Sequence, residues 1–142
     1  MPLKSRRGVA FGDVANNGNI DMVVLNVGEP PSLLMNNAKN ANHRVLFRLI
    51  GVKSNRAAIG ARVTVRAGGV VQFNEVRGGG SYLSQNDLRL HFGLGAAASM
   101  ESVQVRWPNG NVEEIKNLAA DKIYTIVEGQ GIKTSDELPR SH

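Results

Sequence analysis

The sequence lacks several features that define whole classes of protein. It contains no cysteine, so disulfide bonds, thiolate metal sites and cysteine nucleophiles are excluded. It has no apolar run of about 18 residues, so we expect no transmembrane helix and no insertion into a membrane. The basic N-terminus, MPLKSRRGVAFG, has no apolar segment of the kind found in secretory signals, so we expect no signal peptide in this chain.

Helical periodicity and clustered charge are missing as well. No segment of about ten residues carries an apolar stripe with the spacing of a helix. The net charge is +5, but the arginines are scattered, and several alternate with apolar residues, as in ARVTVRA and LRLHF. This spacing places the charges on the solvent side of strands, and no basic run is interleaved with aromatic residues. Nucleic acid is therefore not an expected partner.

Short apolar runs separated by turn residues dominate what is present. The 16 glycines and 5 prolines punctuate runs of valine, isoleucine and leucine that alternate with polar residues, a pattern typical of β-strands. The predicted strands lie within residues 20–27, 32–36, 43–52, 60–67, 70–77, 87–94, 101–107, 111–115 and 122–128. The predicted fold class is all-β: a β-sandwich or barrel-like sandwich of roughly seven to nine short antiparallel strands.

Turn chemistry and alternation also predict a core. Gly68 and Gly69 are expected to form a tight primed turn, which requires positive φ values that glycine adopts readily. The side chains predicted to face the core are Val63, Val65, Val71, Phe73, Leu88, Leu90, Phe92, Leu94 and Trp107. By the same alternation His91 is expected on the outer face of its strand. The polar residues 130–142 are expected to form a flexible tail.

The stretch GDVANNGNID, residues 12–21, has the spacing of a calcium-binding loop. The candidate ligands are Asp13, Asn17, Asn19 and Asp21, with Asn19 contributing its carbonyl. Gly18 follows the fifth position of the loop, where the backbone must turn sharply, whereas Ala15 removes the ligand expected at the third position. The alternative is a polar turn whose Asp and Asn side chains bond to their own backbone. Calcium is the one cofactor that the sequence suggests.

A second candidate site is the polar block RGGGSYLSQND, residues 77–87. Its candidate ligand-binding residues are Ser81, Tyr82, Ser84, Gln85, Asn86 and Asp87. A tyrosine ring beside amide and hydroxyl groups suits a glycan or peptide surface. The alternative is structural, because glycines permit a bulge or a crossover between sheets and Ser, Asn and Asp cap turns. From the residues alone we favour the structural role.

Catalysis has little support in the sequence. Ser84, Asp87 and His91 are the only local set that hints at a hydrolytic triad, and no GxSxG motif accompanies them. Catalytic triads are assembled in space, so closeness along the chain counts for little. We therefore predict that the chain is not an enzyme.

Four segments, in this order and spacing, resemble one domain family. They are SNRAAIGARV (54–63), RGGGSYLSQNDLRLHFGLG (77–95), VRWPNG (105–110) and IVEG (126–129). Residues 43–129 are thereby similar to the ASPIC/UnbV domain of the cartilage acidic protein-like family. Ala57 departs from the family, which commonly has an acidic residue there. Residues 11–37 resemble the final part of an FG-GAP/VCBS repeat, which builds a β-propeller.

The resemblance implies a division of the chain. The expected parts are an extended or disordered N-terminus (1–10), a truncated propeller blade (11–37), a linker (38–42), the ASPIC/UnbV domain (43–129) and a tail (130–142). The resemblance also implies calcium binding by intact blades, and an extracellular or cell-surface location for the full-length family. The two strands expected in the blade have free edges, so they are predicted to pair with their own sandwich or to form a homodimer.

Three functions are consistent with these observations. The leading one is a non-catalytic recognition or adhesion module of a secreted or cell-surface protein, with a glycan or an extracellular protein as its partner. The second is a structural cap or assembly domain that terminates a β-propeller. The third is a glycan-active enzyme or ester hydrolase, which only the polar block and His91 support.

Overall fold

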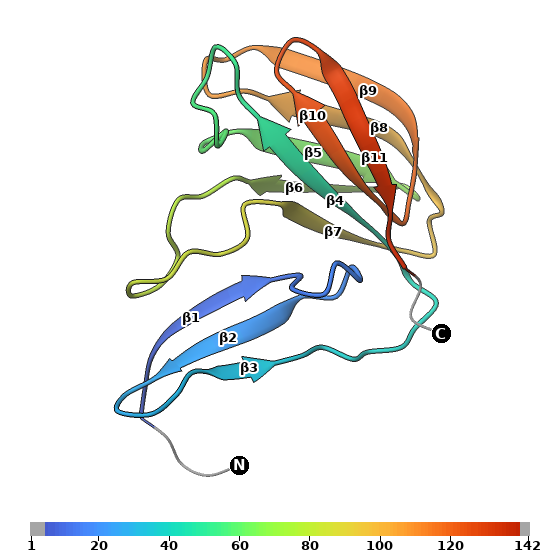
Figure 1. Ribbon diagram of the computed structural model, residues 1–142. Helices are drawn as coiled ribbons and strands as arrows, with labels where there is room; N and C mark the ends of the chain where they lie inside the picture. Colours follow the sequence, from blue (N-terminus) through green and yellow to red (C-terminus); the bar gives the residue numbers. More distant parts are fainter. Residues whose placement is uncertain (1–4, 140–142) are drawn as a thin grey trace.

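The computed structural model describes residues 5–139, which form eleven strands in three sheets (Figure 1). The strands are β1 (Arg6–Gly12), β2 (Asp21–Asn26), β3 (Ser32–Leu34), β4 (His43–Ile50), β5 (Arg62–Ala67), β6 (Val70–Glu75), β7 (Leu90–Gly95), β8 (Ser99–Arg106), β9 (Val112–Ala119), β10 (Lys122–Val127) and β11 (Gly131–Glu137). Residues 5–139 contain no helix, and therefore none that could cross a membrane. The all-β prediction is confirmed, and the architecture is a sandwich rather than a closed barrel.

Two four-stranded sheets form the sandwich. Their strand orders are β11-β10-β4-β7 and β6-β5-β8-β9. Alternate side chains of both sheets point inward, so Val45 and Phe47 of β4 face Val63 and Val65 of β5 with no exposed surface. Each fully buried side chain of this kind stabilises the fold by about 1.5–3 kcal/mol. Trp107, predicted to lie in the core, is buried beside them.

The ends of the chain differ from the prediction. The expected flexible tail is wrong for residues 131–137, which form β11 and pair with β10. This edge strand is exposed and polar along most of its length, so it shows no apolar alternation in the sequence. At the other end, residues 6–10 lie in β1, whereas residues 1–4 and 140–142 fall outside the described part.

One strand pair corrects the expectation of a purely antiparallel fold. β10 pairs with β4 in parallel, from Lys122 opposite Val45 to Val127 opposite Ile50. Because β4 and β10 are separated by the whole of the second sheet, the chain can return to the first sheet in the same direction. No local pattern predicts this pairing.

The hairpin register corrects two of the predicted core positions. Gly68 and Gly69 form the expected tight turn, with φ values of 56° and 76°. This turn places Val71 and Phe73 opposite the outward-facing Arg66 and Thr64 of β5, so both side chains are exposed. The prediction was wrong because pairing through a two-residue turn decides which face each residue takes.

Leu88 is a second exception to the predicted core. It precedes β7, which begins at Leu90, and its side chain is partly exposed. The other predicted members of this strand, Leu90, Phe92 and Leu94, are buried as expected. Side chains alternate between the two faces only within the paired part of a strand. The alternation therefore does not determine the burial of Leu88, which lies before the strand begins.

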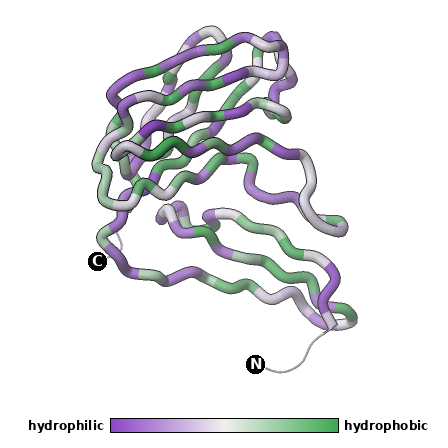
Figure 2. Tube along the Cα trace, turned by 180° about the vertical axis from the view of Figure 1, so that it is seen from behind, coloured by the Kyte–Doolittle hydropathy of each residue, from purple (hydrophilic) through white to green (hydrophobic). Residues whose placement is uncertain are grey.

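The third sheet, here called the N-terminal sheet, consists of β1, β2 and β3 in that order, all antiparallel. It contains three strands where two were expected. Hydrophobic residues run along it as well as along the sandwich (Figure 2). An irregular segment connects β3 to β4, and the loop between β6 and β7 extends from the sandwich alongside β1 (Figure 1).

Candidate functional site: the contact between the N-terminal sheet and the β6–β7 loop

The β6–β7 loop, residues 76–89, bonds to the free edge of β1. The backbone N–H of Val9 donates to Ser81 Oγ at 3.3 Å. The N–H of Phe11 donates to Asn86 Oδ1 at 3.0 Å, and the Phe11 carbonyl accepts from the N–H of Asp87 at 2.8 Å. Val9 and Phe11 are alternate residues whose backbone groups face away from β2. The loop therefore takes the place that a neighbouring strand would occupy.

Two glycines allow the loop to approach β1 this closely. A Cβ atom at Gly8 would lie 2.6 Å from the Tyr82 carbonyl oxygen and 2.8 Å from Ser84 Oγ. A Cβ atom at Gly12 would lie 2.9 Å from the Cβ of Asp87. Any side chain at these two positions would force the strand and the loop apart.

The predicted calcium loop, residues 13–21, forms the turn between β1 and β2. Asp13 Oδ1 accepts the N–H of Asn17 at 3.0 Å, and Asp13 Oδ2 accepts the N–H of Gly18 at 2.7 Å. The two oxygens of Asp21 likewise accept two backbone N–H groups, at 3.0 and 2.8 Å. Both carboxylates are buried. This is the alternative that the sequence left open, a polar turn bonded to its own backbone.

Two arginines of the sandwich bond to this turn. Arg89 donates through Nη2 to the Asp13 carbonyl at 2.8 Å and through Nη1 to Asn16 Oδ1 at 2.6 Å. Arg44 donates through Nη1 to Asn19 Oδ1 at 3.2 Å. The guanidinium groups thus bring positive charge to a turn that carries two buried carboxylates.

The arrangement does not fit a calcium ion. Calcium requires about six to eight oxygen ligands, several of them carboxylates. The oxygens of Asp13 and Asp21 accept backbone hydrogen bonds, and the Asn19 side chain faces the cationic Arg44. Within residues 5–139 no group of three or more acidic or histidine side chains could hold a metal. The sequence left open a calcium site or a polar turn, and these hydrogen bonds favour the polar turn. A calcium titration is the test that decides between the two.

His91 completes the contact between the turn and the sandwich. Its Nε2 lies 2.8 Å from the carbonyl oxygen of Gly18, so the ring donates Nε2–H. Burial lowers the pKa of His91 below 6.5, while the Gly18 carbonyl and the charge of Asp13 oppose this shift and Arg44 adds to it. His91 points away from the core, as predicted, but the turn covers it.

The side chains of the polar block are engaged within the chain. Ser84 Oγ donates to the Tyr82 carbonyl at 2.9 Å, and Gln85 Nε2 donates to a carbonyl of the same loop at 3.4 Å. Asp87 forms an ion pair with Arg89, whose Nε lies 2.8 Å from Asp87 Oδ2. Tyr82 packs under the Arg7 guanidinium, 4.8 Å from the ring centre. These contacts explain the block as a loop that holds β1.

The three side chains that hinted at a hydrolytic triad bond to different partners. Ser84 bonds to a carbonyl of its own loop, Asp87 to Arg89, and His91 to the β1–β2 turn. A triad requires the nucleophile to bond to the histidine and the histidine to bond to the acid. No such pair links these three residues within the described part of the chain.

Glu128 is a buried site that sequence reasoning missed. Its Oε2 accepts the backbone N–H groups of Val52, Lys53 and Ser54, each at 2.8 Å. Its Oε1 accepts Ser54 Oγ at 3.0 Å and Asn109 Nδ2 at 2.6 Å. Burial alone would raise the pKa of Glu128, but the hydrogen bonds from these groups outweigh it and lower the pKa from 4.5 to about 2. The only signal in the sequence was a glutamate directly after an apolar strand.

Comparison with protein families matches residues 51–133 to the family described as ASPIC and UnbV. The match covers more than half of the chain and contains the β6–β7 loop. The expected FG-GAP/VCBS repeat at residues 11–37 lies outside the matched range and stays a prediction. A search of curated proteins found no match. On the strength of the family match, the chain belongs to the ASPIC and UnbV family.

Proposed function

We propose that this chain acts as a non-catalytic assembly domain, in which the sandwich holds the edge of the β-sheet that precedes it. The observation that carries the proposal is the capping of β1: the β6–β7 loop supplies partners for the N–H and the carbonyl of Phe11 and for the N–H of Val9. Of the three functions that the sequence left open, this is the cap or assembly domain.

The contact is suited to fixing the orientation of the sheet. A free strand edge presents unpaired N–H and carbonyl groups that associate readily with other chains, and the loop pairs them instead. Arg44, Arg89 and His91 come from β4, from the loop and from β7, and all three bond to the β1–β2 turn. Anchors on both the strand edge and the turn restrict rotation between the two units.

The remaining surface of the N-terminal sheet supports an assembly role. Leu25, Val27, Leu33 and Met35 are exposed on or beside β2 and β3. β3 pairs with β2 on one side only. Exposed apolar side chains beside an open strand edge are typical of a surface that packs against another β-unit. The propeller that the family resemblance implies is the unit we propose.

The test uses the full chain and the variants Asn86→Ala and Asn86→Asp. Alanine removes the acceptor for the Phe11 N–H, whereas aspartate keeps an oxygen there. We expect hydrogen exchange of the Phe11 amide to rise by about tenfold or more in Asn86→Ala, with the core strands unchanged. The aspartate variant should retain most of the protection. Equal protection of β1 in all three proteins would contradict the proposal.

Recognition is a second candidate function, favoured by the tip of the same loop. Leu83 is 82% exposed with a φ of 47°, and its neighbour Tyr82 is 53% exposed. A branched apolar residue held outward in a left-handed conformation is typical of a contact surface. A screen of glycans and matrix proteins tests this role: binding should be lost in Leu83→Ser. Binding that survives this substitution would remove the tip from consideration.

A further inference from the structure

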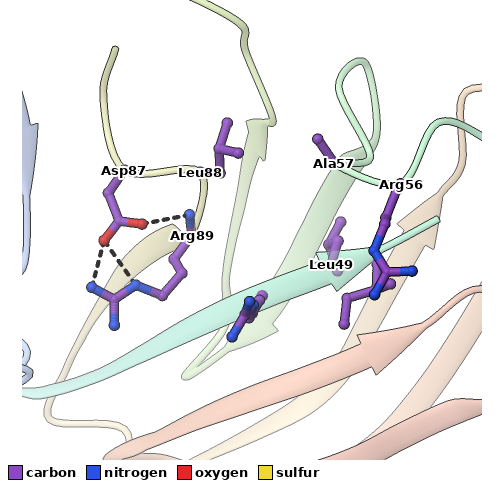
Figure 3. A pocket seen from close by; sticks show the side chains of 8 residues that line it. Leu49, Arg56, Ala57, Asp87, Leu88 and Arg89 are labelled. Atoms are coloured by element: carbon purple, nitrogen blue, oxygen red, sulfur yellow. Dashed lines mark hydrogen bonds and ion pairs between the residues drawn. The ribbon is translucent and has the colours of Figure 1, made fainter.

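A cavity of about 600 Å³ lies beside the β6–β7 loop, and none of the residues that line it comes from the N-terminal sheet (Figure 3). Its walls are the end of β4, the loop that follows β4, and the last residues of the β6–β7 loop. The lining residues are Arg48, Leu49, Ile50, Arg56, Ala57, Asp87, Leu88 and Arg89. Its volume is within the range of about 300–1,000 Å³ that is typical of small-molecule sites.

The topology explains why this space is open. β4 and β7 are paired from His43 opposite Gly95 to Phe47 opposite Leu90, and no pairing continues beyond that point. The last residues of β4 remain paired with β10 on their other side, up to Ile50. Beyond that point β4 and the segment that precedes β7 separate from each other. They leave a wedge-shaped space, and the end of β4 forms one of its walls.

The charges around the cavity are not balanced. Arg89 is neutralised by its ion pair with Asp87 on one wall (Figure 3). Arg48 and Arg56 are exposed, and among residues 5–139 their guanidinium groups have no hydrogen bond or ion pair. In Figure 3, Arg56 lies across the cavity from the Asp87–Arg89 pair. Two unpaired guanidinium groups therefore border a space in which Asp87, the one carboxylate among the described lining residues, already has a partner.

The floor of the cavity is apolar. Leu49 is almost fully buried. Leu88, which was wrongly predicted to lie in the core, lines this space together with Ala57. A guanidinium group binds carboxylate and phosphate oxygens through paired N–H donors, and such charge-assisted bonds are stronger than neutral ones. Apolar walls with a few convergent charged groups are the usual composition of a ligand site.

We propose that this cavity binds a small organic anion, with its carboxylate or phosphate group held by Arg48 and Arg56 and its apolar part against Leu49 and Leu88. The site does not depend on the assembly role. Its two charged contacts lie outside the contact with the N-terminal sheet, so either proposal can fail while the other stands.

The experiment measures binding of four probes to the full chain by calorimetry and by NMR in a phosphate-free buffer. Phenyl phosphate and benzoate carry an oxyanion on an apolar body, inorganic phosphate lacks the apolar body, and benzyl alcohol lacks the charge. We expect saturable binding of phenyl phosphate or benzoate, with shifts of the Leu49 and Leu88 methyl signals. Inorganic phosphate and benzyl alcohol should bind at least about tenfold more weakly.

The variants Arg48→Gln and Arg56→Gln locate the site, and Arg66→Gln is the matched control. Arg66 is also exposed and lies on a strand, but on β5, away from the cavity. We expect each cavity variant to lose about tenfold or more in affinity for the organic anion, with an unchanged melting temperature, and the control to retain it.

Three results would overturn the proposal. One is the absence of saturable binding by both organic anions. Another is an equal loss of affinity in the Arg66→Gln control, which would indicate general attraction to a basic protein. The third is binding of inorganic phosphate as tight as that of phenyl phosphate, which would leave no role for the apolar floor.

Discussion

Single buried polar residues organise the loops of this protein through backbone hydrogen bonds. Glu128 accepts three consecutive N–H groups of the loop after β4. Asp13 accepts two N–H groups of the β1–β2 turn, and Asp21 accepts one N–H of this turn and one from the segment after β3. A buried carboxylate is costly unless it is fully bonded. Each of these residues therefore specifies one loop conformation, because any other would leave the charge without partners.

We predict that Glu128→Gln lowers the melting temperature at neutral pH, since an amide is a weaker acceptor for these N–H groups and adds unmatched donors. The folded pKa of about 2 lies below the ordinary 4.5, so the folded state favours the charged carboxylate. Its stabilising contribution is complete above pH 4.5 and is lost as the pH falls from 4.5 toward 2.

Thermal unfolding across a pH series measures this effect. The loss of stability between pH 4.5 and 2 should be smaller in Glu128→Gln than in the original protein. Glu114→Gln is the control, because Glu114 is an exposed glutamate of β9. If both variants followed the same pH profile, the hydrogen bonds at Glu128 would not be the cause.

A second residue-scale prediction concerns metal. We expect the melting temperature to be the same in chelator and in millimolar calcium. The carboxylate oxygens of Asp13 and Asp21 already accept backbone hydrogen bonds, and the Asn19 side-chain oxygen already accepts a hydrogen bond from Arg44. A calcium ion that bound only the folded state would raise the melting temperature, and the rise would saturate with calcium concentration. A saturable rise that Asp13→Ala abolishes would establish a calcium site at this turn.

At the scale of elements, strand pairing decides which side chains matter for stability. The β5–β6 hairpin turns Phe73 outward, where it is 67% exposed beneath Arg62, whose guanidinium lies 4.8 Å from the ring centre. Phe92 of β7 has nearly the opposite environment, buried edge-to-face against Phe47 with ring centres 5.9 Å apart. Two phenylalanines in similar alternating strands thus differ entirely in burial.

We predict that Phe73→Ala changes the free energy of unfolding by only about 0.5 kcal/mol or less, as for most surface positions. Phe92→Ala should cost about 3–5 kcal/mol, because it removes a buried ring and leaves a cavity. Chemical denaturation of both variants measures the difference. A cost at Phe73 equal to that at Phe92 would mean that the hairpin register differs from the one described.

At the scale of the whole molecule, a small sheet lies beside a sandwich, and the extended β6–β7 loop runs alongside it (Figure 1). Side chains of β4 and β7 bond to the same sheet through its β1–β2 turn. The sandwich has a continuous core, whereas the N-terminal sheet keeps apolar side chains exposed and leaves one edge of β3 unpaired. A three-stranded sheet of this kind buries little apolar surface of its own, so its contacts with other units contribute a large share of its stability.

We predict that the purified chain self-associates through the N-terminal sheet at high concentration, since its open edge and apolar side chains favour pairing with a second copy. The sedimentation coefficient should rise with concentration, and Leu33→Lys on β3 should suppress the rise. Val70→Lys, at an equally exposed position of the sandwich, is the control. Suppression by both variants would indicate non-specific association.

Most strands of the protein could be predicted from the sequence. The strands that were not predicted have a physical explanation. Nine of the eleven strands follow from alternation and from turn residues such as Gly68 and Gly69. β1 lies in a basic, glycine-containing segment and β11 in a polar one, so neither shows the pattern of a half-buried strand. The candidate-site residues lie in the β1–β2 turn and in the β6–β7 loop, and the hydrogen bonds that join these segments to each other and to β1 were not predicted. Ligand or calcium binding by these residues stays a prediction.

By itself the sequence determined the fold class, most strands, the hairpin turns and the family, because these depend on residues close together in the chain. Only the tertiary structure decided that the polar block caps β1, since Val9 and Ser81, or Phe11 and Asn86, are more than seventy residues apart. It likewise decided the parallel pairing of β4 with β10 and the wedge-shaped cavity at the end of β4. Contacts of this range follow from how whole sheets pack, which no local pattern of residues encodes.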